Sequence, residues 1–165
     1  MKKIPLTQGK FALVDDTDFD WLSQWKWHVV LKKSSYYAVR KQYLEIFEGK
    51  ERYKTIYMAR LIMSTPDNLL CDHENGQTLN NQRYNLRNCT KAENQRNRGP
   101  QRNLKSGHKN IYRHLQDNMW RVRISAKGQR TKGGLHHDIN DAIAERDAIV
   151  KEMHGAFART EAFNG

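Results

Sequence analysis

The chain has 165 residues, enough for one ordinary domain or two small ones. Its 29 Lys and Arg residues outnumber its 18 Asp and Glu residues, so the formal charge is +11 and a polyanionic partner is favoured, nucleic acid before an acidic membrane surface. No run approaches about 18 consecutive apolar residues, which excludes a membrane-spanning helix, and the first residues lack the apolar core of a signal peptide.

The positive charge is concentrated in the middle of the chain. Residues 1–90 carry 14 basic and 10 acidic side chains, a net of +4, and residues 133–165 carry 3 and 6, a net of −3. Residues 91–132 carry 12 basic and 2 acidic side chains, a net of +10. Within this stretch, residues 99–105 are predicted to be a basic linker, either a solvated tether or a segment that lies along phosphates.

The two cysteines, Cys71 and Cys89, form no Cys-x-x-Cys pair. Four-cysteine zinc sites and disulfide scaffolds are therefore excluded, and a reducing cytosol is the expected compartment. Both cysteines are interpreted as small core residues rather than catalytic thiols.

Short strands and helices are predicted in the first third of the chain. Weak alternation over residues 4–14 with a Gln8-Gly9 turn predicts a hairpin. Asp15, Asp16 and Thr17 are candidate N-caps for a helix over about 18–24. The aromatic residues of this part fit a core better than a ligand platform. Further predicted elements are a hairpin of strands 27–31 and 36–40, a strand at 52–58 and a short helix at 59–63.

Residues 69–97 predict a strand, a long polar loop, a second strand and a helix. The strands are residues 69–72 and 86–89, and Asn75-Gly76 is a strong turn signal between them. Thr90 followed by Glu93 forms a capping box, which starts the helix at Lys91.

The C-terminal part predicts strands at 110–115, 119–126 and 129–135, followed by a helix capped by Asp138. Because side chains alternate along a strand, Trp120, Val122 and Ile124 share the face that packs on the helix. Arg121 and Arg123 share the opposite, free face. The predicted fold class is α+β.

The run CDHENGQTLNNQRYNLRNCTKAEN, residues 71–94, contains a distinctive order of polar residues. Asp72-His73 ends a strand, Asn85 follows His73 by 12 residues, and Asn94 follows Asn85 by 9. This pattern resembles the HNH endonuclease family, in the zinc-free ββα-metal type of phage and intron homing enzymes, over about residues 57–98. The resemblance implies that His73 and Asn85 are catalytic, with Asn85 bracing the loop.

The chemistry of these residue types agrees with that resemblance. A histidine with a pKa near 6.5 can take a proton from water at neutral pH. The Asp72 carboxylate and the Asn94 amide oxygen suit a hard divalent ion, Mg²⁺ or else Mn²⁺, and no structural zinc is expected. Asp72 and His73 point to opposite sides of an extended strand, so one can hold the metal while the other addresses water.

Plainer interpretations stand beside these. His73 alone could be a surface histidine, Asn81 a loop brace or a turn former, and Arg87 a ligand of a phosphate or of a carboxylate. One position departs from the resemblance: related sequences often carry a His where Ala59 stands here.

Residues 104–160 resemble an AP2-type DNA-binding domain, on Trp120-Arg121-Val122-Arg123-Ile124 and on the closing run from His154 to Ala158. The resemblance implies that the three-stranded sheet lies in the major groove, where arginine either reads guanine or holds phosphate. The candidate DNA contacts are Arg87, Arg96 and Arg98 near the nuclease motif, and Arg113, Arg121, Arg123, Lys127 and Arg130 in this second module.

These observations predict a metal-dependent, site-specific DNA endonuclease that nicks or cuts double-stranded DNA. It is expected to act as a monomer or homodimer without a membrane partner. The expected compartment is the cytoplasm of a bacterial host, and the expected origin is a phage or similar element. The rival is a non-catalytic AP2-like DNA-binding regulator with an impaired HNH unit; RNA binding is disfavoured. The predicted division is a β-rich region (1–56), the HNH unit (57–98), the linker (99–105) and the AP2-like domain (106–160).

Overall fold

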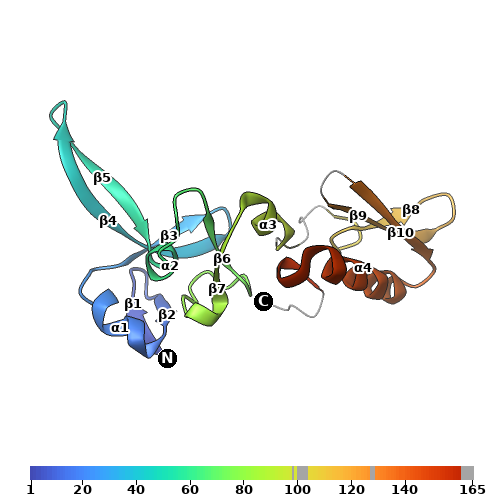
Figure 1. The fold of residues 1–165 in the computed structure, drawn as a ribbon, viewed down its shortest axis with the longest axis horizontal. Helices are drawn as coiled ribbons and strands as arrows, with labels where there is room; N and C mark the ends of the chain where they lie inside the picture. Colours follow the sequence, from blue (N-terminus) through green and yellow to red (C-terminus); the bar gives the residue numbers. More distant parts are fainter. Residues whose placement is uncertain (98, 100–103, 127–128, 161–165) are drawn as a thin grey trace. The chain divides into compact units, whose positions relative to one another are not determined.

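The computed structural model describes residues 1–97, 99, 104–126 and 129–160, and it leaves out the side chains of 125, 126 and 129–132 (Figure 1). The chain divides into two compact units, residues 1–91 (unit 1) and residues 92–164 (unit 2). Both mix short helices with small antiparallel sheets. The α+β class predicted from the sequence is therefore confirmed at this level.

Unit 1 begins with the predicted hairpin and helix. Strands β1 (Lys2–Pro5) and β2 (Phe11–Val14) pair antiparallel. Gln8 and Gly9 both have positive φ in the turn between them, 60° and 65°. The helix α1 (Asp16–Leu22) follows directly.

The second sheet of unit 1 has the order β3-β4-β5 and includes a long two-stranded ribbon. Its strands are β3 (His28–Lys32), β4 (Ser35–Phe47) and β5 (Lys50–Tyr57). β4 runs well past the predicted end at residue 40 and turns at Glu48 and Gly49, both at positive φ. Figure 1 shows the far part of β4 and β5 extending away from the other elements of unit 1.

The strand–loop–strand–helix order predicted for residues 69–97 is confirmed. After the short helix α2 (Met58–Ile62), β6 (Leu70–His73) pairs antiparallel with β7 (Leu86–Cys89). A 3-10 turn, η1 (Arg83–Asn85), ends the loop between them, and α3 (Lys91–Arg96) follows β7.

One hydrophobic core holds unit 1 together across the predicted boundary at 56/57. Side chains from the first hairpin, from α1, from the β3–β4–β5 sheet, from α2 and from β7 pack into it. Its buried members include Ile4, Val14, Leu22, Trp27, Val29, Met58, Ile62 and Leu86. The N-terminal region and the HNH-like strands therefore lie in one packed body, and this body ends at Lys91.

Unit 2 contains the predicted sheet and helix. Strands β8 (Ile111–His114), β9 (Met119–Ala126) and β10 (Gln129–His136) form a sheet of order β10-β9-β8. The helix α4 (Ile139–His154) precedes a 3-10 turn, η2 (Gly155–Phe157). Ile111, Val122, Ile124, Ala142 and Val150 form its buried core, and Trp120 packs against it. The cap predicted at Asp138 is confirmed, because its side chain accepts a 2.7 Å hydrogen bond from the Asn140 backbone N–H.

The ladder between β9 and β10 contains an irregular stretch that contacts α4. The β9–β10 register shifts between Lys132 and Leu135, so Gly133 and Gly134 lie in the irregular stretch. A Cβ at Gly133 would lie 2.4 Å from the Cβ of Val122, and the Gly134 N–H donates to the Glu145 carboxylate at 2.8 Å. Gly133 is thus required by the close approach of two strands.

Within the described ranges, no helix combines the length and the apolar character needed to cross a membrane.

Candidate active site

His73 ends β6 in a buried, hydrogen-bonded position. Its side chain is 6% exposed, and the ring nitrogen Nε2 lies 3.1 Å from the amide oxygen of Asn81. The Asn81 amide nitrogen donates to the Leu79 carbonyl at 3.4 Å, which fixes the orientation of the amide. Because an amide oxygen only accepts hydrogen bonds, Nε2 carries the proton and Nδ1 carries the basic lone pair.

Burial lowers the pKa of His73 below its usual value, because desolvation disfavours the imidazolium. The hydrogen bond to Asn81 and the charge of Asp72 act in the opposite direction but are the smaller effects. At pH 7 the ring is therefore neutral and able to accept a proton.

Asn81 was expected only to brace the loop, and its contact with His73 is the contact that sequence reasoning missed. Its side chain is 1% exposed, and its backbone N–H donates to Leu13 of β2 at 2.8 Å. An eight-residue spacing through an irregular loop has no periodicity that would pair two side chains. The available signal was chemical: an asparagine that is buried must bond to another polar group.

Asp72 forms an ion pair with Arg87, directly across the β6–β7 ladder. The guanidinium donates from Nε at 3.0 Å and from a terminal nitrogen at 2.9 Å to the same carboxylate oxygen. Both side chains are mostly buried. Of the two ligands left open for Arg87, the structure shows a carboxylate.

Asn85 bonds across the loop between β6 and β7. Its amide nitrogen donates to the Asn80 carbonyl at 2.8 Å, and its amide oxygen accepts from the Asn75 backbone N–H at 3.0 Å. The Asn85 carbonyl also accepts from Glu74 N–H at 2.8 Å. These bonds are the loop brace expected of this residue, and they fix the turn that follows His73.

The same loop is hydrogen-bonded to α1 and to the residue that precedes this helix. The Arg83 guanidinium donates two hydrogen bonds, at 2.8 and 2.7 Å, to the buried carboxylate of Asp18. Asp15 accepts from the Gln82 side chain and from the Arg83 backbone N–H. Asp15 does occupy the N-cap position of α1, but its side chain makes no capping bond because it bonds to this loop instead. The N-terminal region therefore braces the polar loop.

The other residues of the predicted nuclease motif lie at the start of unit 2. Asn94 and Arg96 are half-buried residues of α3, and from Ala92 onward this helix is assigned to unit 2. The two predicted metal ligands, Asp72 and Asn94, are thus divided between the units. Arg98 lies outside the described residues.

Ala59 and the cysteines take structural positions. Ala59 is 7% exposed and lies in the unit 1 core, so a small side chain is packed where related sequences often carry a His. Cys89 is buried, and burial raises the pKa of the Cys71 thiol. The raised pKa disfavours the reactive thiolate, in agreement with a packing role.

The donor chemistry of the predicted metal ligands fits a hard cation. Among the described residues, no group of three or more His, Cys, Asp or Glu is placed to hold a metal ion. The predicted pair instead combines one carboxylate with one amide oxygen. Mg²⁺ takes few protein ligands and keeps several waters, so this donor set suits it in kind and number.

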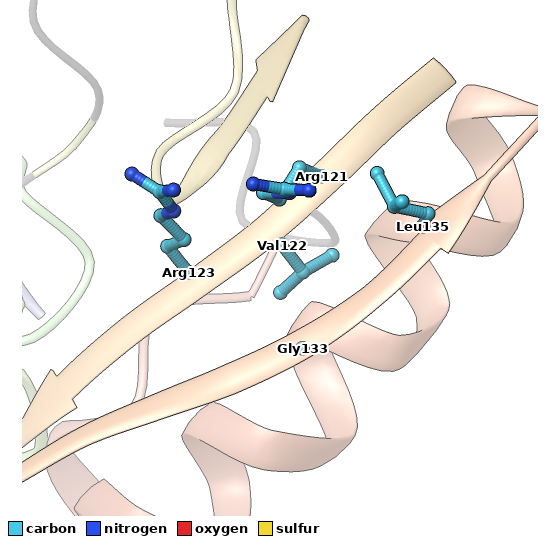
Figure 2. Close-up of a pocket in the computed structure, with 5 residues that line it drawn as sticks. All are labelled: Arg121, Val122, Arg123, Gly133 and Leu135. Atoms are coloured by element: carbon cyan, nitrogen blue, oxygen red, sulfur yellow. The ribbon is translucent and has the colours of Figure 1, made fainter. Parts of the chain in front are cut away.

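In unit 2, Arg121 and Arg123 project from β9 to one side of the sheet and Val122 to the other, as Figure 2 shows. With Gly133 and Leu135 these residues line an open cavity of about 330 Å³. Arg123 is exposed, Arg121 is half-buried, and Val122 is in the core. The basic free face predicted from strand alternation is present.

Arg113, another candidate DNA contact, lies on the opposite face of the sheet from Arg121 and Arg123. It pairs with Trp120 in the ladder, and its guanidinium lies 4.6 Å from the centre of the Trp120 ring. Because side chains alternate along β8, Arg113 lies on the same face of the sheet as Ile111 and on the opposite face from Tyr112. It therefore lies at the rim of the core face. Lys127 and the side chain of Arg130 lie outside what the structure describes.

The chain is similar to Protein 3.8 of Escherichia phage T7. The two are 27% identical over 121 residues, which cover 73% of this chain and 98% of the relative. No family model matches the chain, and no solved structure matches it. The name of the relative states no activity.

Proposed function

We propose that this protein is a metal-dependent, site-specific DNA endonuclease of the HNH type. The observation that carries the proposal is a buried histidine held by an amide, His73 on Asn81, adjacent in the strand to a carboxylate, Asp72. A base next to a carboxylate that can bind a metal ion suits the hydrolysis of a phosphodiester. The basic sheet of unit 2 supports a DNA substrate.

In this proposal His73 is the general base. Nδ1 takes a proton from the attacking water, while Nε2–H remains bonded to the Asn81 amide oxygen and holds the ring through the charge change. Water oxygen bonds to phosphorus, and the bond from phosphorus to the 3′ oxygen breaks. Asn85 and Asn81 keep the loop in place, and these two are positioning residues because neither need touch the phosphate.

Asp72 would be the ligand from unit 1 for the divalent ion, and Asn94 is the second ligand that the HNH resemblance implies; when bound, the ion would supply charge stabilisation to the phosphate and to the departing oxygen. Arg87 is then the residue that orients the Asp72 carboxylate through its two hydrogen bonds. A single site cuts one strand per engagement, so a monomer would nick and a double-strand cut would need a dimer or a second visit.

Unit 2 is proposed to be the reader, with an AP2-like sheet that carries Arg121 and Arg123 into the major groove. A relative from a bacteriophage supports action inside an infected bacterial cell, on host or phage DNA.

A second candidate is a DNA-binding regulator without catalysis. The observation that favours it is the Asp72–Arg87 pair, because a metal ion would have to share a carboxylate that already accepts two guanidinium hydrogen bonds. In that case the fold would be retained for binding alone.

Incubation of the protein with supercoiled plasmid and with phage DNA distinguishes the nuclease from the DNA-binding regulator. The nuclease predicts nicked or linear product with Mg²⁺, no product with EDTA, and a loss of about 10²–10⁴ in rate for His73→Ala. Circular dichroism checks that the His73→Ala protein is folded, so that a loss of product reflects the loss of the base and not of the fold. Tight DNA binding without product from any DNA would overturn the nuclease and support the regulator.

A further inference from the structure

The far part of the β4–β5 ribbon (residues 41–55, here the arm) is exposed on both faces. Every residue in this range is exposed, and five large apolar or aromatic side chains are 46–64% accessible. They are Tyr43, Leu44, Ile46, Phe47 and Tyr53. A two-stranded hairpin without a covered face is marginally stable in water, and such a concentration of apolar surface marks an interaction site.

One face of the ribbon is continuous with the candidate active site. Every second residue of β4 from Tyr37 to Tyr43 lies on this face. The Tyr37 ring is 6.3 Å from the His73 ring and 6.1 Å from the Tyr57 ring. Further out, Tyr43 and Tyr53 pair across the strands with ring centres 5.7 Å apart. The ribbon therefore leads directly away from His73.

The part of the ribbon nearest the site is basic. Arg40, Lys41 and Lys54 are its charged residues over 39–43 and 53–57, and no acidic residue occurs there. Lys32 and Lys41 lie over the rings of Tyr57 and Tyr53, at 4.8 and 5.8 Å, which holds both ammonium groups on the face that leads from His73.

The acidic residues of the arm lie toward its tip, and two of them have partners within the arm. Arg52 approaches Glu45 to 3.6 Å, and the Tyr53 hydroxyl donates to Glu51 at 2.5 Å. Along the ribbon, the repulsion of a polyanion is therefore weakest at the end nearest the site, where every charged side chain is basic.

We infer that the arm is a second DNA-binding element, which lies in a groove of duplex DNA beside the scissile phosphate. This rests on the proposed function. The major groove admits a two-stranded ribbon. From Arg40 to Phe47 the strand spans eight residues, about 26 Å, which equals about seven or eight base pairs of duplex. Lys41 and Lys54 contact phosphates, and the exposed aromatic and aliphatic side chains contact sugars and base edges.

The test uses the full chain with Lys41→Ala/Lys54→Ala, matched by Lys3→Ala/Lys26→Ala, two exposed lysines of unit 1 outside the arm. Binding to a mixed-sequence duplex of about 40 base pairs is measured against salt concentration. Two lost phosphate contacts lower the slope of log K against log salt by about 1.8. The control pair leaves the slope unchanged. Equal slopes for wild type and the arm variant, or equal losses in both variants, would overturn the inference.

A shortened arm gives a second, independent measurement. Gln42 and Lys54 are register partners, so residues 43–53 can be replaced by Asn-Gly, which closes a two-residue hairpin. Because the removed side chains are exposed, the Tm is expected to stay the same. The hydroxyl-radical footprint should shorten by about four or five base pairs on one side.

The outcomes of these measurements distinguish a failure of the arm proposal from a failure of the nuclease proposal. A shorter footprint without cleavage by wild type supports the arm and counts against the proposed catalysis. An unchanged footprint with Mg²⁺-dependent cleavage overturns the arm alone. Absence of DNA binding by the wild-type protein overturns both the arm proposal and the nuclease proposal. A change in oligomeric state on shortening, with the footprint intact, assigns the arm to contacts between copies of the chain and overturns the DNA assignment.

Discussion

The Arg83 guanidinium donates two hydrogen bonds to the carboxylate of Asp18, and the two residues are 65 positions apart in the chain. Asp18 is 2% exposed and also accepts from the Trp21 indole N–H at 3.1 Å. The loop that carries Asn80, Asn81 and Asn85 is thereby tied to α1. The geometry around His73 thus depends on residues far from the HNH-like motif.

We expect Asp18→Ala to lower the free energy of unfolding by about 1.5–3 kcal/mol, because three donors lose a buried charged acceptor. Urea unfolding measures the change. Asp20→Ala is the control: its carboxylate is exposed and approaches Lys2 only to 3.8 Å, so the effect should stay within about 0.5 kcal/mol. Equal effects of the two substitutions would show that the Asp18–Arg83 clamp contributes nothing.

Gly133→Ala is expected to destabilise unit 2 by about 1–3 kcal/mol, since the new Cβ would meet the buried Val122 side chain at 2.4 Å. Gly134→Ala is the matched control, because its Cβ would meet only the ends of the His136 and Glu145 side chains, at 3.2 Å or more. Thermal unfolding measures both. A Gly134→Ala cost as large as that of Gly133→Ala would contradict the steric explanation.

The strands and helices with a buried face could be predicted from the sequence. In β9 the alternation of Val122 and Ile124 with Arg121 and Arg123 identified both faces, because burial enforces the period of two. The same reasoning failed for the outer part of β4, where polar and apolar residues occur on both faces and nothing is buried. Its Glu48-Gly49 turn is also a weaker signal than Asn-Gly.

In the candidate site, residue types were predictable but partners were not. Asp72, His73 and Asn85 stand at spacings that suggest their roles. The contacts of His73 with Asn81 and of Asp18 with Arg83 depend on how an irregular loop folds against the first hairpin and α1, which no local period encodes. The face on which Arg113 lies depends on the register of β8 against β9, which no local period of the sequence encodes.

The two faces of the unit 2 sheet predict different effects on DNA affinity. If the free face binds DNA, Arg121→Ala/Arg123→Ala should reduce affinity and lower the slope of log K against log salt by up to about 1.8. Arg113→Ala should change the slope little, because its guanidinium lies over Trp120 and donates to Asn118. Fluorescence anisotropy at several salt concentrations measures the slopes. A larger loss for Arg113→Ala would reverse the assignment of faces.

The lowered pKa of His73 predicts a pH dependence of stability. The unfolded ring takes a proton as the pH falls through about 6.5, whereas the folded ring resists protonation until a lower pH. The stability that neutral His73 contributes is therefore complete above pH 6.5 and is lost as the pH falls toward the folded pKa. Unfolding in urea with EDTA at pH 7 and pH 5 measures this loss.

His73→Gln should lose less stability between these two pH values than wild type, since glutamine does not titrate. His154, whose pKa burial also lowers, is present in both proteins and cancels in the comparison. Parallel pH profiles for wild type and variant would contradict the lowered pKa of His73.

Arg87→Met should reveal whether Asp72 belongs to a metal site. Removing the guanidinium leaves a mostly buried carboxylate without its ion-pair partner, which costs about 3 kcal/mol of unfolding free energy in EDTA. If Asp72 binds Mg²⁺, the ion should restore the lost stability, by about 2.7 kcal/mol at about 100 times its dissociation constant. Urea unfolding across a Mg²⁺ titration measures the recovery.

The control for this rescue is Arg87→Met/Asp72→Asn, in which the charge is absent and Mg²⁺ should add no stability. The single variant should respond to Mg²⁺ more strongly than wild type, because in wild type the ion competes with Arg87 for one carboxylate oxygen. A Mg²⁺ response that is equal in the single and double variants would place the ion elsewhere. No response in any of the three proteins would favour the DNA-binding regulator over the nuclease, since the base at His73 would then act without a metal ligand beside it.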